Sequence, residues 1–302
     1  RGLGDVYKRQ VHTHSSKAGI LGRLAARLES VPAVVHTVHG FGFTPLQSAP
    51  KRLLFKSVER LAARGTDHFV MVSETDLDRG VEIGIFPRER ATVIRAAIEI
   101  ERFRSIGSGG EVHDRLGLPP GAPVVTQIGN FKPQKAPLDF VKMAAAVHRR
   151  FPQTQFVMVG DGPLKVEAER LAHSLGLVEA MTFCGWWDAI PGLLAATDVS
   201  VLTSRHEGLP CSVVESLAAG VPVVATAVDG TVEVVRPGVN GFLAPAGDIR
   251  ALADHVCAIL EKPELKRQLA AAAPEHLEDF DVSVMVRQQE DLYRCIGPMS
   301  HS

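Results

Sequence analysis

Two glutamates eight positions apart, Glu207 and Glu215, bracket a Gly-Leu-Pro turn in this 302-residue chain. The apolar residues that follow keep helical spacing at first and form an unbroken run from Gly220, a pattern that predicts loop, helix, tight turn and buried strand. A helix that begins directly after a turn offers unpaired N–H groups and a partial positive charge, and both suit a phosphate. The stretch therefore predicts anion capture at the start of a helix.

The backbone and the side chains of this stretch suit different parts of a ligand. Pro210 suits the first helical position, where its missing N–H costs nothing, so the amides that face a phosphate would be those of Cys211 and Ser212. Glu215 falls one turn into the helix, where a carboxylate can accept a bidentate hydrogen bond from a vicinal diol such as a ribose. The alternative is an ordinary amphipathic helix with one exposed glutamate and one loop glutamate.

The stretch as a whole carries a resemblance. The Glu-Gly-Leu-Pro opening, the spacing of Glu207 and Glu215, Ala218–Ala225 and the following Asp229-Gly230 and Glu233 resemble the donor-site segment of family 4 retaining glycosyltransferases of GT-B fold. The resemblance implies that Glu215 binds the ribose hydroxyls of a sugar nucleotide and that Glu207 lies beside the transferred sugar. It also implies that the residues between them contact the donor: Gly208, Leu209, Cys211 and Ser212.

A basic loop is expected earlier in the same half of the chain. Val124–Pro137 reads as strand, glycine turn, basic loop and helix start, and a lysine held over a crevice can neutralise a leaving diphosphate. The resemblance gives Lys135 this role. Asn130 stands where family members usually carry arginine, a departure that puts one phosphate contact in doubt, and Lys132 is either its substitute or a solvated side chain.

Two further segments are expected to line the nucleotide site. Gln155–Leu164 reads as a strand that runs into a glycine turn, and Gly162 is assigned to the substrate-binding residues. Its Gly-x-Gly lacks the third glycine of the dinucleotide fingerprint, so the motif alone is weak. The resemblance implies that the segment containing Phe183 and Gly185 borders the nucleotide base.

One histidine near the start of the chain is a candidate for the reacting centre. Ala33–Phe43 reads as a buried strand that reaches a glycine-softened loop, and ligands bind at the carboxyl ends of strands in open parallel sheets. The resemblance implies that His39 lies between donor sugar and acceptor; the alternative is a strand-end histidine with a structural role. A metal shared by His36 and His39 is not expected, because residues three apart on a strand point to opposite faces.

Composition limits the classes of partner. The formal net charge of −1 gives no general attraction to nucleic acid. The four cysteines form no Cys-x-x-Cys pair, which argues against a zinc site and a disulfide framework and favours a reducing cytoplasm. No secretory signal or membrane span is expected. Contact with the inner face of the membrane is left open, because Pro50–Arg64 reads as a basic amphipathic helix with Leu53, Leu54, Val58 and Leu61 inward; a solvated face is the alternative.

Alternating strands and helices predict an α/β protein with parallel sheets. The expected architecture is GT-B, with two Rossmann-like domains facing each other across a cleft and the first one incomplete. Residues 1–10 are expected to be an atypical leader before a truncated start. The acceptor-side domain is expected over 11–121, the donor domain over 122–281, and a C-terminal helix that crosses back to the first domain over 282–302.

The resemblance predicts a retaining glycosyltransferase that needs no metal or other cofactor. The donor would be a UDP- or GDP-sugar, and the acceptor a sugar or lipid-linked hydroxyl, for example in polysaccharide or glycolipid synthesis. Asp76-Leu-Asp78 and Asp279-Phe-Asp281 match the metal-binding Asp-x-Asp of other glycosyltransferases only formally, since neither follows a convincing buried strand. The alternatives are a GT-B sugar-nucleotide epimerase and an inactive nucleotide-sugar-binding protein; the oligomeric state is not predicted.

Overall fold

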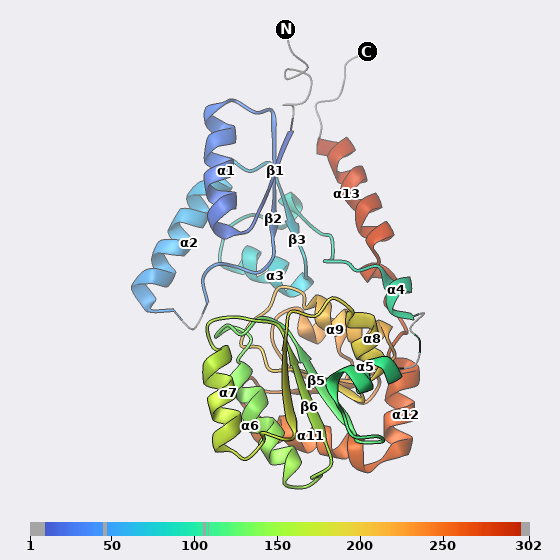
Figure 1. Ribbon diagram of the computed structural model, residues 1–302. Coiled ribbons are helices and arrows are strands. Elements are labelled where there is room, and N and C mark those ends of the chain that lie inside the picture. Colours follow the sequence, from blue (N-terminus) through green and yellow to red (C-terminus); the bar gives the residue numbers. More distant parts are fainter. Residues whose placement is uncertain (1–9, 45–46, 105–106, 108, 297–302) are drawn as a thin grey trace. The chain divides into compact units, whose positions relative to one another are not determined.

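The computed structural model describes residues 10–44, 47–104, 107 and 109–296. The chain divides into two compact units (Figure 1). Unit 1 combines the start of the chain, to Ala97, with the C-terminal segment from Val282, and unit 2 is the continuous stretch Ile98–Asp281. Most of the expected leader, residues 1–9, lies outside the described residues, and Gln10 already belongs to the first strand.

Unit 1 is built on a four-stranded parallel sheet of order β1-β2-β3-β4. Parallel neighbours need a crossover connection, and a helix supplies each one. The elements are β1 (Gln10–His14), α1 (Ser16–Leu28), β2 (Ala33–Val38), α2 (Ala49–Ala63), β3 (His68–Met71), α3 (Glu74–Glu82), the 3₁₀ turn η2 (Arg88–Arg90), β4 (Ala91–Val93) and α13 (Val282–Ile296).

The two faces of this sheet bury different residues. On one face Phe69 and Met71 pack with Ala63 of α2 and Leu77 of α3. On the other face Val35, Val70 and Ile94 form a second cluster, which is covered by side chains of the C-terminal helix α13: Met285, Leu292 and Ile296. Helix α13 therefore packs against the core of unit 1 and belongs to that unit.

Unit 2 holds a six-stranded parallel sheet of order β10-β9-β8-β5-β6-β7. Its elements are α4 (Ile100–Arg104), α5 (Gly110–Leu116), β5 (Val124–Ile128), α6 (Pro137–His148), β6 (Gln155–Val159), α7 (Lys165–Ser174), β7 (Met181–Gly185), α8 (Ile190–Ala195), β8 (Val199–Leu202), α9 (Cys211–Ala218), β9 (Val223–Thr226), α10 (Thr231–Val234), β10 (Gly241–Ala244), α11 (Ile249–Glu261), α12 (Pro263–Ala272) and the 3₁₀ turn η3 (Glu278–Phe280). The chain adds β6 and β7 on one side of β5, then β8, β9 and β10 on the other.

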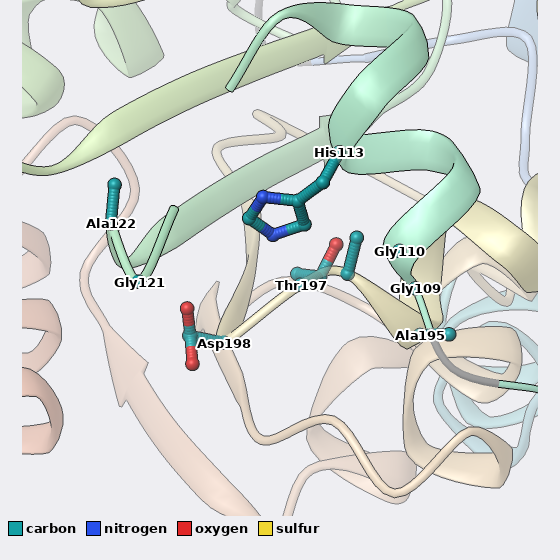
Figure 2. Close-up of a pocket in the computed structure, with 9 residues that line it drawn as sticks. Gly109, Gly110, His113, Gly121, Ala122, Ala195, Thr197 and Asp198 are labelled. Carbon is teal, nitrogen blue, oxygen red and sulfur yellow. The ribbon is translucent and has the colours of Figure 1, made fainter. Parts of the chain in front are cut away.

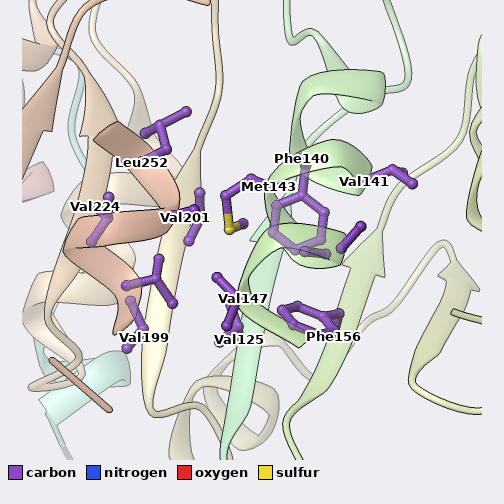
Figure 3. Packing of buried hydrophobic residues seen from close by; sticks show 14 of the residues in the cluster. Val125, Phe140, Val141, Met143, Val147, Phe156, Val199, Val201, Val224 and Leu252 are labelled. Atoms are coloured by element: carbon purple, nitrogen blue, oxygen red, sulfur yellow. The ribbon is translucent and has the colours of Figure 1, made fainter. Parts of the chain in front are cut away.

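The main core of unit 2 lies between this sheet and the helices α6 and α11 (Figure 3). Phe140 and Met143 of α6 pack against Val125 and Phe156 of the sheet, and Leu252 of α11 extends the cluster. Each of these side chains is at most 1% exposed. Most residues of the strands are apolar on both faces, as in parallel strands covered by helices.

The boundary between the units differs from the expected position near residue 121. The expectation rests on residues 105–121, which are rich in Gly, Ser and Pro, but Val112 and Leu118 are buried in a cluster with Val124. The backbone N–H of Ile98 also donates to the carbonyl of Phe280 at 2.9 Å. This segment packs on unit 2, so the division falls at 97/98 instead.

The orientation expected for the leucines of α2 is wrong. Leu53, Leu54 and Leu61 are 63%, 62% and 54% exposed, while Phe55 and Ala63 contact the core of unit 1. The helix carries two apolar rows, and only one of them can face the sheet. Among the residues described, no helix has the length and apolar character that crossing a bilayer requires.

Candidate functional site

The sheet of unit 2 reverses its strand order beside β5, and this determines where a ligand can bind. β5 pairs with β6 on one side and with β8 on the other. In open α/β sheets the crevice at such a switch point, outside the carboxyl ends of the strands, is the ligand site. The loop after β5 contains Lys135 and the loop after β8 contains Glu207, so the two loops meet at this point.

Lys135 and Glu207 form a close ion pair. The Nζ of Lys135 lies 2.6 Å from Oε1 of Glu207, and the Ser204 hydroxyl donates to the same oxygen at 2.5 Å. The side chains of Lys135 and Glu207 are only 18% and 6% exposed. A buried carboxylate without partners would be costly, and these two contacts offset that cost. Sequence reasoning missed Ser204, which has no signal of its own beyond its position three residues before Glu207.

Backbone contacts hold both loops in place. The N–H of Arg205 donates to the carbonyl of Gln134 at 2.7 Å, which ties the β8 loop to the β5 loop. The N–H of Glu207 donates to a carboxylate oxygen of Asp229 at 2.8 Å, and the N–H of Gly230 donates to the carbonyl of Gly208 at 3.1 Å. The Asp-Gly pair singled out in the sequence therefore supports the Glu207 loop.

Lys135 is positioned by a strained residue next to it. Ala136 has a φ of 45° and a ψ of 55°, the left-handed region that a residue with a Cβ rarely adopts. The buried Thr203 hydroxyl makes hydrogen bonds to the carbonyls of Lys135 and Ala136, at 2.9 and 3.0 Å. These bonds hold the turn between the loop and α6, so the strained conformation has a visible support.

Helix α9 begins at the expected turn. Pro210 is the N-cap and not the first helical residue, so the helix begins one residue later than predicted. Cys211 and Ser212 are its first two residues. First-turn amides have no partner within a helix, so those of Cys211 and Ser212 can face a ligand, and the N–H of Cys211 also contacts its own thiol. Burial raises the pKa of the Cys211 thiol, and the nearby Glu215 raises it further. The thiol is thus a neutral group beside these amides.

Glu215 lies one turn into α9, as predicted, but in a different environment from Glu207. Burial raises the pKa of Glu215, and only the positive charge of Arg102 opposes that shift. Arg102 belongs to α4, which packs on α9. Sequence reasoning missed this arginine, since nothing in the sequence indicates that α4 returns to the donor loop.

The other predicted donor residues surround the same edge of the sheet. Asn130 and the exposed Lys132 lie in the loop after β5. Gly162 has a φ of 155°, and a Cβ there would lie 2.8 Å from the carbonyl oxygen of Phe131. Gly185 ends β7 with a φ of 66°, and its carbonyl accepts from the N–H of Gly160 at 2.7 Å. Gly162 lets the loops after β5 and β6 approach closely, and Gly185 permits the left-handed backbone at the end of β7.

Two predicted residues are partly or wholly packed in the core. The Phe183 ring packs against the core of unit 2, with its centroid 6.1 Å from that of Phe131. Leu209 is 8% exposed. Neither presents a large free surface, so any contact of these residues with a ligand falls mainly to their backbone.

His39 of unit 1 lies just after β2 in a cluster of histidines. Its Nε2 is 3.1 Å from Nδ1 of His14, and the rings of His12 and His14 stack with centroids 4.4 Å apart. His12 is hydrogen-bonded through Nδ1 to the Tyr293 hydroxyl of α13 at 2.5 Å and through Nε2 to Thr37 at 2.7 Å. His36 takes no part in the stack; its ring bonds the Thr13 hydroxyl at 2.9 Å.

His39 and His12 are held neutral. Partial burial, then the proximity of His14, lowers the pKa of His39, and the same causes lower that of His12 to about 4. His14 and His39 line a cavity of about 280 Å³ in unit 1, whose other walls include Val70, Ile94 and Met285. Across residues 10–44, 47–104 and 109–296, no three His, Cys, Asp or Glu side chains are grouped so that they could hold a metal ion.

Comparisons with known proteins identify the family of this chain. Residues 110–276 match the model of the glycosyl transferases group 1, and residues 10–102 match that of glycosyltransferase family 4. The UDP-Gal:α-D-GlcNAc-diphosphoundecaprenol α-1,3-galactosyltransferase of Escherichia coli is 32% identical over 287 residues, covering 94% of this chain and 74% of the relative. The chain is a family 4 glycosyltransferase.

A second relative supports the family assignment, and a solved structure supports the fold. The α-D-kanosaminyltransferase of Streptomyces kanamyceticus is 28% identical, covering 95% of this chain and 78% of the relative. Among solved structures, Anabaena Alr3699/HepE in complex with UDP and glucose superposes with a TM-score of 0.83 at 23% identity, over 95% of this chain and 77% of that chain. At that identity the match shows the fold, which is GT-B as expected. The epimerase and inactive-protein alternatives are not favoured.

A second hollow in this family 4 glycosyltransferase lies away from the donor residues. It has a volume of about 320 Å³ and is lined by Gly121, Ala122, His113, Thr197 and Asp198 among others (Figure 2). Gly121 and Ala122 precede β5, and Thr197 and Asp198 precede β8, so the hollow lies at the amino ends of these strands. None of the predicted site residues lines it.

Proposed function

We propose that this family 4 glycosyltransferase moves a sugar from a UDP- or GDP-sugar to a hydroxyl acceptor with retention of the anomeric configuration. The observation that carries the proposal is the convergence of a lysine, an acid and a helix start at the switch point of the unit 2 sheet. Lys135 and Glu207 make their ion pair there, and α9 begins three residues after Gly208.

The donor diphosphate would be held by one ammonium group and a helix start. Lys135 Nζ and the amides of Cys211 and Ser212 are the donors available for its oxygens, with Asn130 or Lys132 as a further contact. In the absence of ligand, Glu207 neutralises Lys135. When the bond between the anomeric carbon and the phosphate oxygen breaks, that oxygen keeps the electron pair, and the charge of Lys135 stabilises it.

The sugar and the ribose would each be bound by one glutamate. Glu207 lies beside the transferred sugar and accepts hydrogen bonds from its hydroxyls, and Glu215 accepts both hydroxyls of the ribose. Each glutamate has support for its charge nearby: Glu207 from Lys135 at 2.6 Å, and Glu215 from Arg102. The base would border the backbone at Phe183 and Gly185.

The acceptor hydroxyl would attack the anomeric carbon from the face that the diphosphate leaves, and its proton would pass to the phosphate oxygen that has kept the electron pair of the broken bond. His39 is the group of unit 1 assigned to this step, and its lowered pKa suits a neutral hydrogen-bonding role. The name of the E. coli relative specifies a lipid diphosphate acceptor. This supports a lipid-linked acceptor here too, reached at the inner face of the membrane in polysaccharide or glycolipid synthesis.

We expect the reaction to need no divalent metal, because Lys135 and the α9 amides supply the positive potential at the diphosphate. Transfer should continue in EDTA at the rate measured without it. A loss of activity in EDTA that Mg²⁺ or Mn²⁺ restores would contradict this part of the proposal.

The decisive experiment combines nucleotide binding with product analysis. Calorimetry with UDP and GDP should find one tightly bound nucleotide. The Lys135→Ala variant should bind it at least about tenfold more weakly, since a hydrogen bond to a charged group contributes about 1.5–3 kcal/mol. The exposed Lys142 of α6 provides the control, because Lys142→Ala removes an equal charge away from the loops.

A panel of nucleotide sugars with a polyprenyl-diphosphate sugar as acceptor should then yield a glycoside. Formation of an epimerised nucleotide sugar without any glycoside would overturn the proposal. So would nucleotide binding that Lys135→Ala leaves unchanged.

A further inference from the structure

Helices α1 and α2 of unit 1 turn two rows of leucines away from the core. Leu21, Leu24 and Leu28 of α1 are 70%, 40% and 85% exposed, and Leu53, Leu54 and Leu61 of α2 are 63%, 62% and 54% exposed. We call these six side chains the leucine face. They account for six of the thirteen large hydrophobic side chains exposed in the part of the chain that the structure describes, so the exposure is concentrated on two helices.

The two rows belong to one surface. On α1 the leucines lie opposite the buried Gly19, Arg23 and Ala26. On α2 they lie opposite the buried Glu59, Ala62 and Ala63. α1 and α2 lie side by side in Figure 1, and the buried ion pair of Arg23 with Glu59, 2.6 Å long, joins them. Both outward rows therefore face away from the same side of the sheet.

The charge on these helices has one sign. They contain seven Lys or Arg and a single acid, Glu59, whose charge is used internally by Arg23. The remaining basic side chains of the two helices are Lys17, Arg27, Lys51, Arg52, Lys56 and Arg60. Lys56 lies over the Phe43 ring and Arg60 donates to the carbonyl of Ile83, whereas Lys17, Arg27 and Lys51 are exposed. The chain as a whole has a formal net charge of −1, so the exposed charges of Lys17, Arg27 and Lys51 are a local concentration of positive charge beside the leucine face.

We propose that the leucine face binds an anionic lipid bilayer, with the leucines at the boundary of headgroups and acyl chains and the basic side chains among the lipid phosphates. An apolar row beside Lys and Arg on a helix is the pattern of interfacial membrane helices. A second copy of this chain is disfavoured, because it would bring the same positive charges against each other, and lysine is depleted in protein interfaces. The inference deepens the proposed function, since a bilayer is where a lipid-linked acceptor lies.

Vesicle flotation tests this directly. The whole chain should float with vesicles of phosphatidylcholine and phosphatidylglycerol and remain unbound with phosphatidylcholine alone. The Leu54→Glu/Leu61→Glu double variant should lose at least about tenfold in partitioning, because two apolar side chains are replaced by charges. Val166 and Val178 of unit 2 are 55% and 57% exposed, so Val166→Glu/Val178→Glu is a matched control that should bind like the wild type.

A second double variant tests the contribution of the positive charges to membrane binding. Lys17→Gln/Lys51→Gln removes two exposed charges and leaves the leucines in place. It should weaken binding to anionic vesicles by about fivefold per charge at low salt, and raising the salt should reduce that difference. Circular dichroism and thermal unfolding should show that these surface variants keep the wild-type fold.

Three results would overturn the proposal. The wild type could fail to float with anionic vesicles, or the leucine variant could float equally well. Thirdly, the wild type could be a dimer in sedimentation that Leu54→Glu/Leu61→Glu dissociates, with neither protein binding vesicles; the leucine face would then be a protein interface. Vesicle binding by a chain that transfers no sugar would count against the proposed function alone, because flotation does not depend on turnover.

Discussion

Glu207 and Glu215 are alike in sequence but differ in how their charges are supported. Glu207 has an ammonium group at 2.6 Å and a hydroxyl on the same oxygen. Glu215 is largely enclosed, burial raises its pKa, and the more distant Arg102 is the charge that opposes the shift. A carboxylate in that position gains most from a ligand that brings hydroxyl donors to it.

Replacement of Glu215 by Gln should therefore weaken binding of the nucleotide through its ribose. We expect a loss of about 10- to 100-fold in affinity for UDP or GDP, the range for a hydrogen bond to a charged group. Calorimetry should compare the nucleotide with its 2′-deoxy form. The variant should lose much less affinity for the deoxynucleotide, and equal losses for both would show that Glu215 does not bind the 2′-hydroxyl.

The buried His36 of unit 1 makes the stability of the folded chain depend on pH. Burial, followed by the charge of Arg23, lowers the pKa of His36 to about 3. An unfolded histidine titrates near 6.5. Between these values the unfolded chain binds more protons than the folded one, so stability falls as the pH falls from 6.5 and is unaffected above it.

Thermal unfolding between pH 7 and pH 4 should test this linkage. The wild-type melting temperature should fall with pH, and His36→Gln should show a shallower fall, because it removes about 1.4 kcal/mol per pH unit of proton uptake on unfolding. Its melting temperature will also be lower throughout, since the His36 ring fills the space above Gly19. The slope is thus the diagnostic quantity. His173→Gln, on the exposed side of α7, should keep the wild-type slope.

At the scale of single elements, the turn into α6 controls where Lys135 points. Ala136 keeps its left-handed conformation while Thr203 binds the carbonyls on either side of the Lys135–Ala136 peptide. Thr203 is fully buried. Its hydroxyl therefore connects the start of α6 to the end of β8.

Loss of that hydroxyl should affect stability and donor binding together. Thr203→Val keeps the shape but leaves two carbonyls without this donor, so we expect unfolding to become easier by about 1–3 kcal/mol. Denaturant unfolding measures this cost, and UDP or GDP titration should show weaker binding as Lys135 loses its support. Thr203→Ser keeps the hydroxyl and should restore most of the stability and most of the nucleotide affinity. If Thr203→Ser behaves like Thr203→Val, the methyl group and not the hydrogen bond is responsible.

Local sequence patterns predicted the helices and strands well. They did not predict the contacts between helices and strands that are distant in the sequence. The helix after the Gly-Leu-Pro turn follows from a turn and a spacing within one stretch, although it begins at Cys211, one residue later than predicted. The ion pair of Lys135 and Glu207 joins residues 72 positions apart, so only the family resemblance brought the two residues into one site. Arg102 was missed for the same reason. The exposed leucines of α2 were placed in the core because periodicity reports an apolar row without saying which of two rows meets the sheet.

At the scale of the whole molecule, every residue assigned to the donor belongs to unit 2. This unit is one continuous stretch, Ile98–Asp281, and its two ends pair with each other through a β-bridge between Ile98 and Asp281. It also has its own six-stranded sheet and core. These properties are those of a segment that folds independently.

Residues 98–281 expressed alone should therefore fold cooperatively and bind the donor nucleotide. We expect a single thermal transition and an affinity for UDP or GDP within about tenfold of the whole chain, because no donor contact is assigned to unit 1. Lys135→Ala in this fragment should weaken binding as it does in the whole chain. A fragment without a cooperative transition would show that unit 2 needs unit 1 to fold.

The neighbouring ends of unit 2 also bear on how such enzymes can be recombined. Because Ile98 and Asp281 are adjacent, the segment between them can be exchanged for its counterpart from a relative by joining the chain at two nearby points, without rethreading the sheet of unit 1. If the proposed function is correct, a chimera made in this way would take its choice of sugar from one parent and its choice of acceptor from the other.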